Sequence, residues 1–246
     1  MKKFVVVMLL LLPLGVVAQD TTPPRGVGPD QALNKWVGGI DLGFISTSGN
    51  TDTETLTFSF DLGRKGENWN HVYHLEAFNN SSEGDRSAEK YLTYWQSNFK
   101  FNERQSIFFR GEYEEDKFGS FDYQGTVTVG YSQVVIDTDR HNLVLDAGPG
   151  YRKSKIKETQ ETEGEGIIRL AGDYNWKISK TAKFGQFLSA EKGSKNTVGR
   201  SRTYLEVNII EALAVKLSYH VRWNKEVAPT DDNFDRETIV SVVYKW

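Results

Sequence analysis

The end of the chain alternates between two kinds of side chain, and the alternation runs to the final tryptophan. One face carries Thr238, Val240, Val242, Tyr244 and Trp246, and the other carries Glu237, Ile239, Ser241, Val243 and Lys245. A period of two residues is that of a β-strand whose faces meet different surroundings. An apolar face closed by a C-terminal aromatic residue is typical of an outer-membrane β-barrel in a Gram-negative bacterium, where this face meets lipid. We predict such a barrel, with Val242, Tyr244 and Trp246 as the signal for its barrel-assembly machinery.

Residues 1–18 have the features of a secretory signal peptide. An apolar run from Phe4 to Leu12 follows two lysines, and small residues end the segment before the chain turns polar. Such a run is too short for a transmembrane helix, which needs about 20 apolar residues. We therefore predict cleavage after Ala18. The predicted mature chain has a periplasmic linker over residues 19–35 and an outer-membrane barrel over residues 36–246.

Composition excludes several classes of protein. The chain has 30 basic and 33 acidic residues, and this mild acidic excess argues against a nucleic-acid partner. Cysteine is absent, which excludes disulfides, thiolate metal sites, a cysteine nucleophile and a lipid anchor on cysteine. Yet 14 Phe, 11 Tyr and 6 Trp accompany a low mean hydropathy. This combination is expected for strands with one lipid face and one wet face, with aromatic girdles at both membrane interfaces.

Segments with a period of two residues recur from Trp36 onward. In one of them, Leu56, Phe58, Phe60 and Leu62 alternate with polar residues. We predict about twelve antiparallel strands, with ten as the alternative, and an even number is usual for single-chain bacterial barrels. The predicted strands span 36–46, 53–65, 69–79, 88–101, 105–117, 122–136, 141–153, 164–178, 182–190, 200–210, 213–225 and 236–246.

The connections between these strands alternate between short and mostly longer ones, as periplasmic turns and extracellular loops do. The longer ones are rich in Ser, Gly, Lys and Glu, for example 80–87, 154–163 and 191–199. Pro149 lacks a backbone donor and predicts a bulge or bend in its strand. The alternative to a membrane barrel is a soluble periplasmic barrel or sandwich, which would bury its apolar face and need fewer girdle aromatics.

The segment Trp36–Asp52 (WVGGIDLGFISTSGNTD) opens on Trp, places Gly beside Gly, and continues to Ser48-Gly49-Asn50-Thr51 before the next strand. It resembles the YdiY-like family of salt-induced outer-membrane proteins, domain-of-unknown-function family 481, and the resemblance runs to Trp246. The resemblance implies an outer-membrane barrel and a link to salt stress, and it brings no reaction, ligand or catalytic residue. Gly49-Asn50 suits a tight hairpin turn, and we favour this structural role over a binding role.

Two histidines have neighbours that suggest chemistry. His71 has Asn68, Asn70 and Ser97 as possible neighbours, and a serine hydrolase on the lipid face would need such a pair in contact. No serine lies in a sequence motif typical of a hydrolase nucleophile, so a hydrolase is the least favoured hypothesis. His74 and Glu76 share the lumen face and could hold a metal, but a lumenal hydrogen-bonding network is favoured. We predict no catalytic residue, cofactor or metal, and no enzyme.

Charges at the outer end of the barrel suggest two further roles. The acidic stretch from Glu112 to Asp116 could attract divalent cations. We favour the alternative, in which these residues form a solvated rim of the barrel. Lysines in the longer connections lie beside glutamates, as at Lys155, and others form a basic pair at Lys192 and Lys195. These cations could bind outer-membrane lipid and anionic lipopolysaccharide.

The inferred lumen face carries both signs of charge in similar numbers. Such charges could set the selectivity of an open channel, or they could cross-link into a closed interior. Our first hypothesis is a small passive pore for ions or small polar solutes, because twelve strands lie between filled eight-stranded barrels and open porins. The alternative is a non-conducting structural or surface-binding barrel. The residues predicted to line the pore are Arg110, Glu112, Glu114, Arg169, Asp173 and Arg222.

Overall fold

The structure is a computed structural model that describes residues 33–47, 53–227 and 232–246. The predicted signal peptide with its cleavage site, residues 19–32 of the predicted linker, and the turn Ser48-Gly49-Asn50-Thr51 lie outside the described residues. Among the residues described, no helix is long and apolar enough to cross a membrane.

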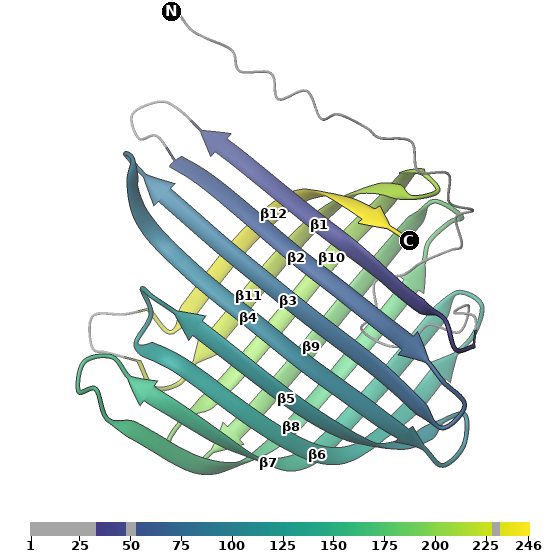
Figure 1. Ribbon diagram of the computed structural model, residues 1–246, viewed down its shortest axis with the longest axis horizontal. Coiled ribbons are helices and arrows are strands. Elements are labelled where there is room, and N and C mark those ends of the chain that lie inside the picture. The colour runs from purple at the N-terminus through teal and green to yellow at the C-terminus, as the bar shows by residue number, and fades with distance from the viewer. Residues whose placement is uncertain (1–32, 48–52, 228–231) are drawn as a thin grey trace, which may run out of the picture.

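Within the described residues the chain forms twelve strands that close into one antiparallel barrel, in which each strand pairs with its neighbours in sequence and β1 pairs with β12 (Figure 1). The predicted all-β fold is therefore confirmed, with twelve strands rather than ten. The strands are β1 (Trp36–Thr47), β2 (Thr53–Lys65), β3 (Trp69–Ser82), β4 (Asp85–Lys100), β5 (Gln105–Asp116), β6 (Phe121–Asp137), β7 (His141–Ile156), β8 (Thr162–Lys177), β9 (Ala182–Gly193), β10 (Thr197–Ile210), β11 (Leu213–Asn224) and β12 (Phe234–Lys245).

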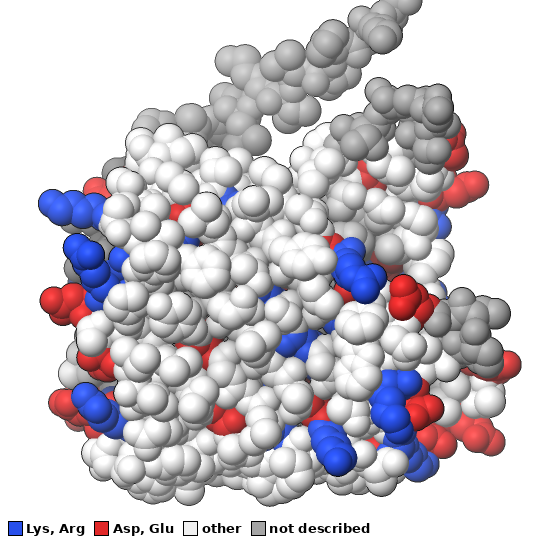
Figure 2. All heavy atoms as spheres, turned by 180° about the vertical axis from the view of Figure 1, so that it is seen from behind, with Lys and Arg blue, Asp and Glu red and all other residues white. Residues whose placement is uncertain are grey.

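The period of two residues separates an apolar outer wall from a polar interior. In β12 the side chains of Val240, Val242 and Tyr244 are exposed on the outside, while Ser241 and Lys245 are buried inside. Figure 2 shows an outer wall that is largely free of charge, with lysine, arginine and acidic side chains gathered toward its two ends. An apolar wall outside and a charged interior are the reverse of a soluble barrel, whose apolar face lies inside.

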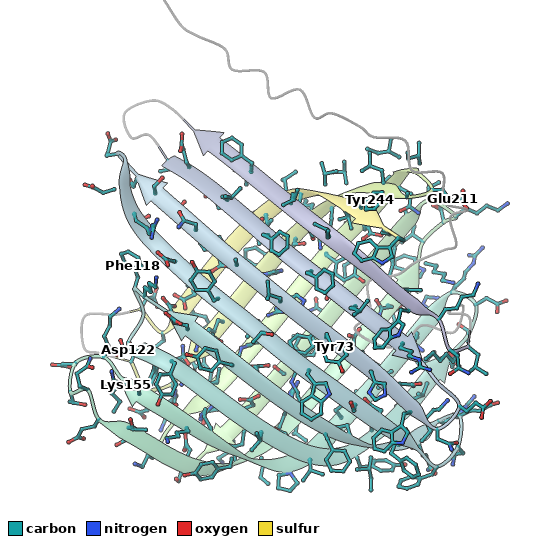
Figure 3. The ribbon with its side chains drawn as sticks, in the orientation of Figure 1. Tyr73, Phe118, Asp122, Lys155, Glu211 and Tyr244 are labelled. Carbon is teal, nitrogen blue, oxygen red and sulfur yellow. The ribbon has the colours of Figure 1, made fainter. Side chains whose placement is uncertain are left out.

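The two ends of the barrel differ in their connections. The end with the short turns holds the start of β1 and the end of β12, and we call it the turn end. The opposite end, the loop end, holds Phe118, Asp122 and Lys155, whereas Glu211 and Tyr244 lie toward the turn end (Figure 3). At the loop end Lys155 Nζ lies 3.0 Å from Asp122 Oδ2.

Several loop-end connections are shorter than the sequence predicts. The predicted loop 80–87 is a two-residue turn, because Glu83 and Gly84 both have positive φ, 54° and 86°. Two adjacent residues with positive φ twist a turn in the same sense as its strands, so β3 and β4 continue as a tight hairpin. β7, β8, β9 and β10 also extend into segments predicted as loops.

The barrel closes between β1 and β12 over residues 39–43 and 241–245. Trp246 extends this seam, since its backbone N donates to the Gly38 carbonyl and its carbonyl accepts from the Gly38 N, each at 3.2 Å. The indole ring packs 6.1 Å from the ring of Phe60, and a side chain on Gly38 would collide with it. The terminal residue thus completes the wall, and its role as an assembly signal stays a prediction.

Pro149 interrupts the pairing of β6 with β7 without inserting a residue. Thr128 pairs with Gly150 and Tyr131 with Ala147, so the register is the same on both sides of an unpaired step. Here Gly148 and Gly130 lie so close that a Cβ on Gly148 would meet the Val129 carbonyl oxygen and the Gly130 Cα. The predicted irregularity at Pro149 is therefore a gap in the ladder, held by the close approach of two glycines.

We expect Gly148→Val to destabilise the folded barrel by about 1–3 kcal/mol, because overpacking forces the two strands apart. The matched control is Gly166→Val, since a Cβ on Gly166 meets nothing within 4 Å. Urea unfolding of the refolded protein, followed by the shift of the folded band on unheated gels, measures the difference. Equal stability of the two variants would contradict the close approach.

Candidate functional site: a charged layer across the barrel

The inner wall of β5 carries a row of charges in the middle of the barrel and toward its loop end. Arg110, Glu112, Glu114 and Asp116 all point inward because they are two residues apart on one strand. Arg110 Nη2 donates to Glu112 Oε2 at 2.5 Å, and its guanidinium lies 3.8 Å from the centre of the Tyr94 ring. The arginine is thereby fixed against the wall by an ion pair and by a cation–π contact.

Arg200 on β10 spans the lumen to this row. Its Nη2 lies 2.9 Å from Glu114 Oε2 and 3.2 Å from Glu112 Oε1. β5 and β10 are separated by four strands along the wall, so these ion pairs connect opposite sides of the barrel. Arg222 on β11 adds a second link, since it pairs with Glu114 and donates to Gln124 Oε1 at 2.6 Å.

A second carboxylate, Glu191 on β9, extends the same group around the wall. Its side chain lies 3.6 Å from Arg152, 3.9 Å from Arg169 and 3.9 Å from Arg200. Arg152 is fully buried and also donates to Glu165 Oε1 at 2.7 Å and to the Asn196 carbonyl at 2.6 Å. We call this connected set the charged layer, and it consists of Arg110, Glu112, Glu114, Arg152, Glu165, Arg169, Glu191, Arg200 and Arg222.

The charged layer separates two cavities within the described part of the barrel. The larger, of about 620 Å³, opens at the turn end and reaches Arg110, Glu112 and Arg200. The smaller, of about 330 Å³, lies at the loop end and reaches Glu114 and Arg222. Both cavities therefore end on the same group of paired side chains, which occupies the lumen between them.

The six residues predicted to line a pore all face the lumen, as the alternation requires. The structure shows which of them are in contact. Arg110, Glu112, Glu114 and Arg222 meet in the charged layer, and Arg169 joins through Glu191. Asp173 lies nearer the turn end in the larger cavity, where it accepts from Asn175 Nδ2 at 2.6 Å. Whether these residues set the selectivity of a pore stays a prediction.

The prediction that the acidic stretch from Glu112 to Asp116 forms a solvated rim is wrong for Glu112 and Glu114. Both side chains are buried in ion pairs with arginines from other strands. Asp116 is also buried, and its carboxylate accepts from the backbone N of Phe118 and of Gly119 at 2.9 Å each. It therefore caps the turn that follows β5.

Two residues that hold the charged layer together, Glu191 and Arg200, were not predicted from the sequence. Glu191 falls in a predicted loop, but β9 continues to Gly193 and brings its carboxylate inward. Arg200 is the first residue of its predicted strand, where the face of a side chain is hardest to assign. The signal that could have found it is its spacing of two residues from Arg202, which also faces the lumen.

The histidines divide between the two faces. His71 on the outer face has Nδ1 2.7 Å from Ser97 Oγ, which also accepts from Trp95 Nε1 at 2.9 Å. Ser97 was the predicted neighbour, but the contact lies within a cluster of aromatic rings, since His71 stacks on Trp69. Inside the barrel, His74 Nδ1 lies 2.7 Å from Asp61 Oδ1, as expected for a lumenal network.

Comparison with known proteins places the chain in a family. A family model described as "Protein of unknown function, DUF481" matches residues 40–246. The chain belongs to this family. The resemblance drawn from residues 36–52 is therefore confirmed. The uncharacterized protein YdiY of Escherichia coli K12 is 28% identical over 232 residues, which cover 94% of this chain and 91% of YdiY.

Solved structures share the fold at low identity. The NanC porin has a TM-score of 0.52 and 12% identity over 83% of this chain and 98% of its own. An outer-membrane channel from Pseudomonas putida F1 has a TM-score of 0.53 and 8% identity over 92% of this chain and all of its own, 100%. At such identities the similarity shows the fold alone, and that fold is an outer-membrane β-barrel.

Glu191 offers a direct test of the charged layer. We expect Glu191→Gln to destabilise the folded barrel by about 3 kcal/mol, because three buried arginines lose a shared counter-charge. Glu163→Gln is the matched control, since its ion pair with Lys195 is much more exposed, and it should cost less than about 1 kcal/mol. Chemical unfolding in detergent measures both, and an equal effect of the two substitutions would contradict the buried network.

Proposed function

We propose that this barrel is a narrow passive passage for ions or small polar solutes, with the charged layer as its constriction. The observation that carries the proposal is the pair of cavities, one at each end, which approach each other at Glu112, Glu114, Arg200 and Arg222. Among the described residues, side chains of the charged layer line both cavities at this level. Exposed side chains change rotamer within picoseconds to nanoseconds, so a layer of side chains can open without movement of the wall once its ion pairs are exchanged.

The electrostatics of the layer suit small charged solutes. Opposed charges that line a constriction replace part of the hydration shell of a passing ion, and they exclude apolar solutes. The size of the barrel agrees, since eight strands leave an interior filled by side chains and 16–18 strands leave an open channel. A twelve-stranded barrel with long arginines has room for a passage that its side chains nearly fill.

The proposal includes a location and partners. We place the barrel in the outer membrane, with the turn end toward the periplasm, since short turns and both chain ends face the periplasm in bacterial barrels. Lysines at the loop end, such as Lys155 and Lys195, would then face lipopolysaccharide. Recognition of Val242, Tyr244 and Trp246 by the barrel-assembly machinery, and the link to salt stress, are part of the same proposal.

A second candidate is a non-conducting structural or surface-binding barrel. It is favoured by the number of strands that Arg200 and Glu191 connect, because ion pairs between opposite walls stiffen a barrel and close its lumen. The two candidates differ in whether the wild-type layer opens.

Single-channel recording in a planar bilayer distinguishes them. We expect the wild-type barrel to pass small ions in small steps, and Arg200→Ala to raise the conductance several-fold, because it removes the side chain that crosses the lumen. Glu114→Gln should shift the reversal potential toward anion selectivity, since Arg200 and Arg222 lose a counter-charge. Lys195→Ala, at an exposed ion pair of the loop end, is the control and should leave both quantities unchanged.

Each result has a definite meaning. A silent wild type with a conducting Arg200→Ala variant would favour the closed barrel over the pore. If both folded proteins are silent, the proposal of a passage along the lumen is wrong. Conductance that does not respond to Arg200 or Glu114 would show that ions do not pass through the charged layer.

A further inference from the structure

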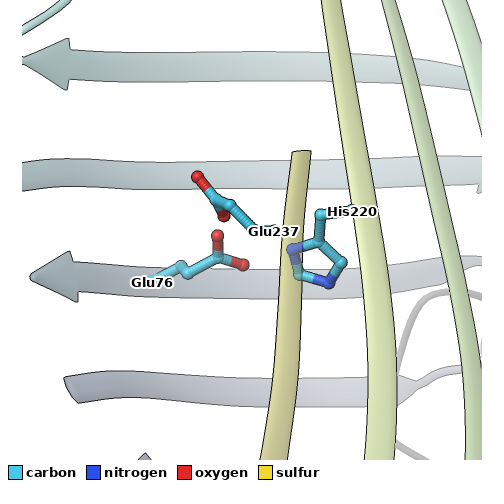
Figure 4. A group of neighbouring side chains, drawn as sticks. All are labelled: Glu76, His220 and Glu237. Atoms are coloured by element: carbon cyan, nitrogen blue, oxygen red, sulfur yellow. The ribbon is translucent and has the colours of Figure 1, made fainter. Parts of the chain in front are cut away.

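Three side chains on the inner wall converge beside the charged layer. Glu76 of β3, His220 of β11 and Glu237 of β12 point toward one another (Figure 4), and each offers a ligand atom within 4.8 Å of the other two. His220 and Glu237 face each other directly in the register of β11 with β12. Glu76 approaches them from the wall on the other side of β1 and β2. None of the three belongs to the charged layer.

The two carboxylates are held in place by neighbours. Glu76 Oε2 lies 3.4 Å from His74 Nε2, and the other ring nitrogen of His74 lies 2.7 Å from Asp61 Oδ1. Glu237 Oε1 accepts from Lys90 Nζ at 3.0 Å. Carboxylate ligands of protein metal sites are commonly oriented in this way by hydrogen bonds from a second group.

Space for an ion and its water adjoins the three side chains. A cavity of about 60 Å³ is lined by all three, and a second of about 40 Å³ is lined by Glu76 and His220. Each exceeds the roughly 10–15 Å³ needed for one water molecule. The first also shares Glu114, Arg222 and Asp235 with the cavity of about 330 Å³ at the loop end, so it adjoins the space that opens there.

The ligand set selects a class of metal. One imidazole nitrogen and two carboxylate oxygens suit zinc and divalent first-row transition metals, whereas calcium and magnesium require oxygen ligands alone. Metal–ligand bonds of about 2.0–2.2 Å require the three ligand atoms to draw closer together, which rotation of the glutamate side chains would have to supply. Arg202 lies 4.0 Å from Glu76 and Lys90 lies 3.0 Å from Glu237, so both positive charges oppose the binding of a cation and a bound metal would have to compete with them.

We propose that Glu76, His220 and Glu237 bind one divalent transition-metal ion, with water completing its coordination. The ion would join β3 to β11 and β12 inside the barrel, independently of whether the lumen conducts.

Cobalt(II) is a suitable probe, because its visible absorption reports tetrahedral or five-coordinate ligation. Untagged residues 19–246, refolded in detergent, should bind one cobalt ion per barrel, and zinc should displace it while millimolar magnesium should not. His220→Gln should weaken binding more than about 100-fold, and His74→Gln should weaken it less, because loss of an outer partner typically costs about 10–100-fold. His141→Gln is the matched control, since this histidine bonds Tyr174 far from the site.

The folded state of each variant is checked by its migration on unheated gels, and Glu237→Gln replaces His220→Gln if the latter does not fold. Loss of the cobalt spectrum in the His220 or Glu237 variant, with retention in His141→Gln, supports the site. The proposal is overturned if no saturable binding is found up to about 1 mM metal, a concentration at which even a weak site is half occupied. It is equally overturned if folded His220→Gln or Glu237→Gln binds as tightly as the wild type.

Discussion

The interior of this barrel depends on the ion pairs that Arg200 makes across it. Closing twelve alternating strands turns every second side chain inward, and many of these side chains are charged. A buried charge without a partner costs several kcal/mol, so the inward charges have to find one another across the lumen or meet water. Arg200 meets this requirement for two walls at once, because it reaches Glu112 and Glu114 on β5 while Glu191 lies beside it on β9.

The arrangement of cavities follows from this constraint. Toward the turn end the lining of the larger cavity mixes charged side chains with uncharged polar ones, such as Gln96 and Asn98, and the lumen stays open. In the charged layer the long arginine side chains fill the section instead. The pairing of these inward charges therefore accounts for the closed section, and a passage would have to exchange these ion pairs for contacts with a solute.

The sequence predicts the wall of the barrel better than its interior. Alternation assigns a face to each residue, so the inward position of Arg110, Arg169 and Arg222 could be predicted. It does not say which residues meet across the lumen, because strands opposite each other have no fixed relation in sequence. Arg200 and Glu114 are 86 positions apart, and only closure of the barrel brings them together.

Strand ends were predicted least well, for a physical reason. Near the loop end the residues are polar on both faces, so the period of two is lost while the strands still pair. Glu191 was assigned to a loop for this reason, and the hairpin at Glu83 and Gly84 was predicted as a longer connection. The convergence of Glu76 with His220 and Glu237 was equally invisible, since three strands supply the three side chains.

A double-mutant cycle on Glu114 and Arg200 tests the central claim most directly. Stability is measured by chemical unfolding for the wild type, Glu114→Gln, Arg200→Gln and the double variant. If the two side chains pair across the lumen, the double variant loses less stability than the sum of the single variants, by more than about 1 kcal/mol. Additivity within about 0.5 kcal/mol would contradict the pairing and, with it, the charged layer that closes the barrel.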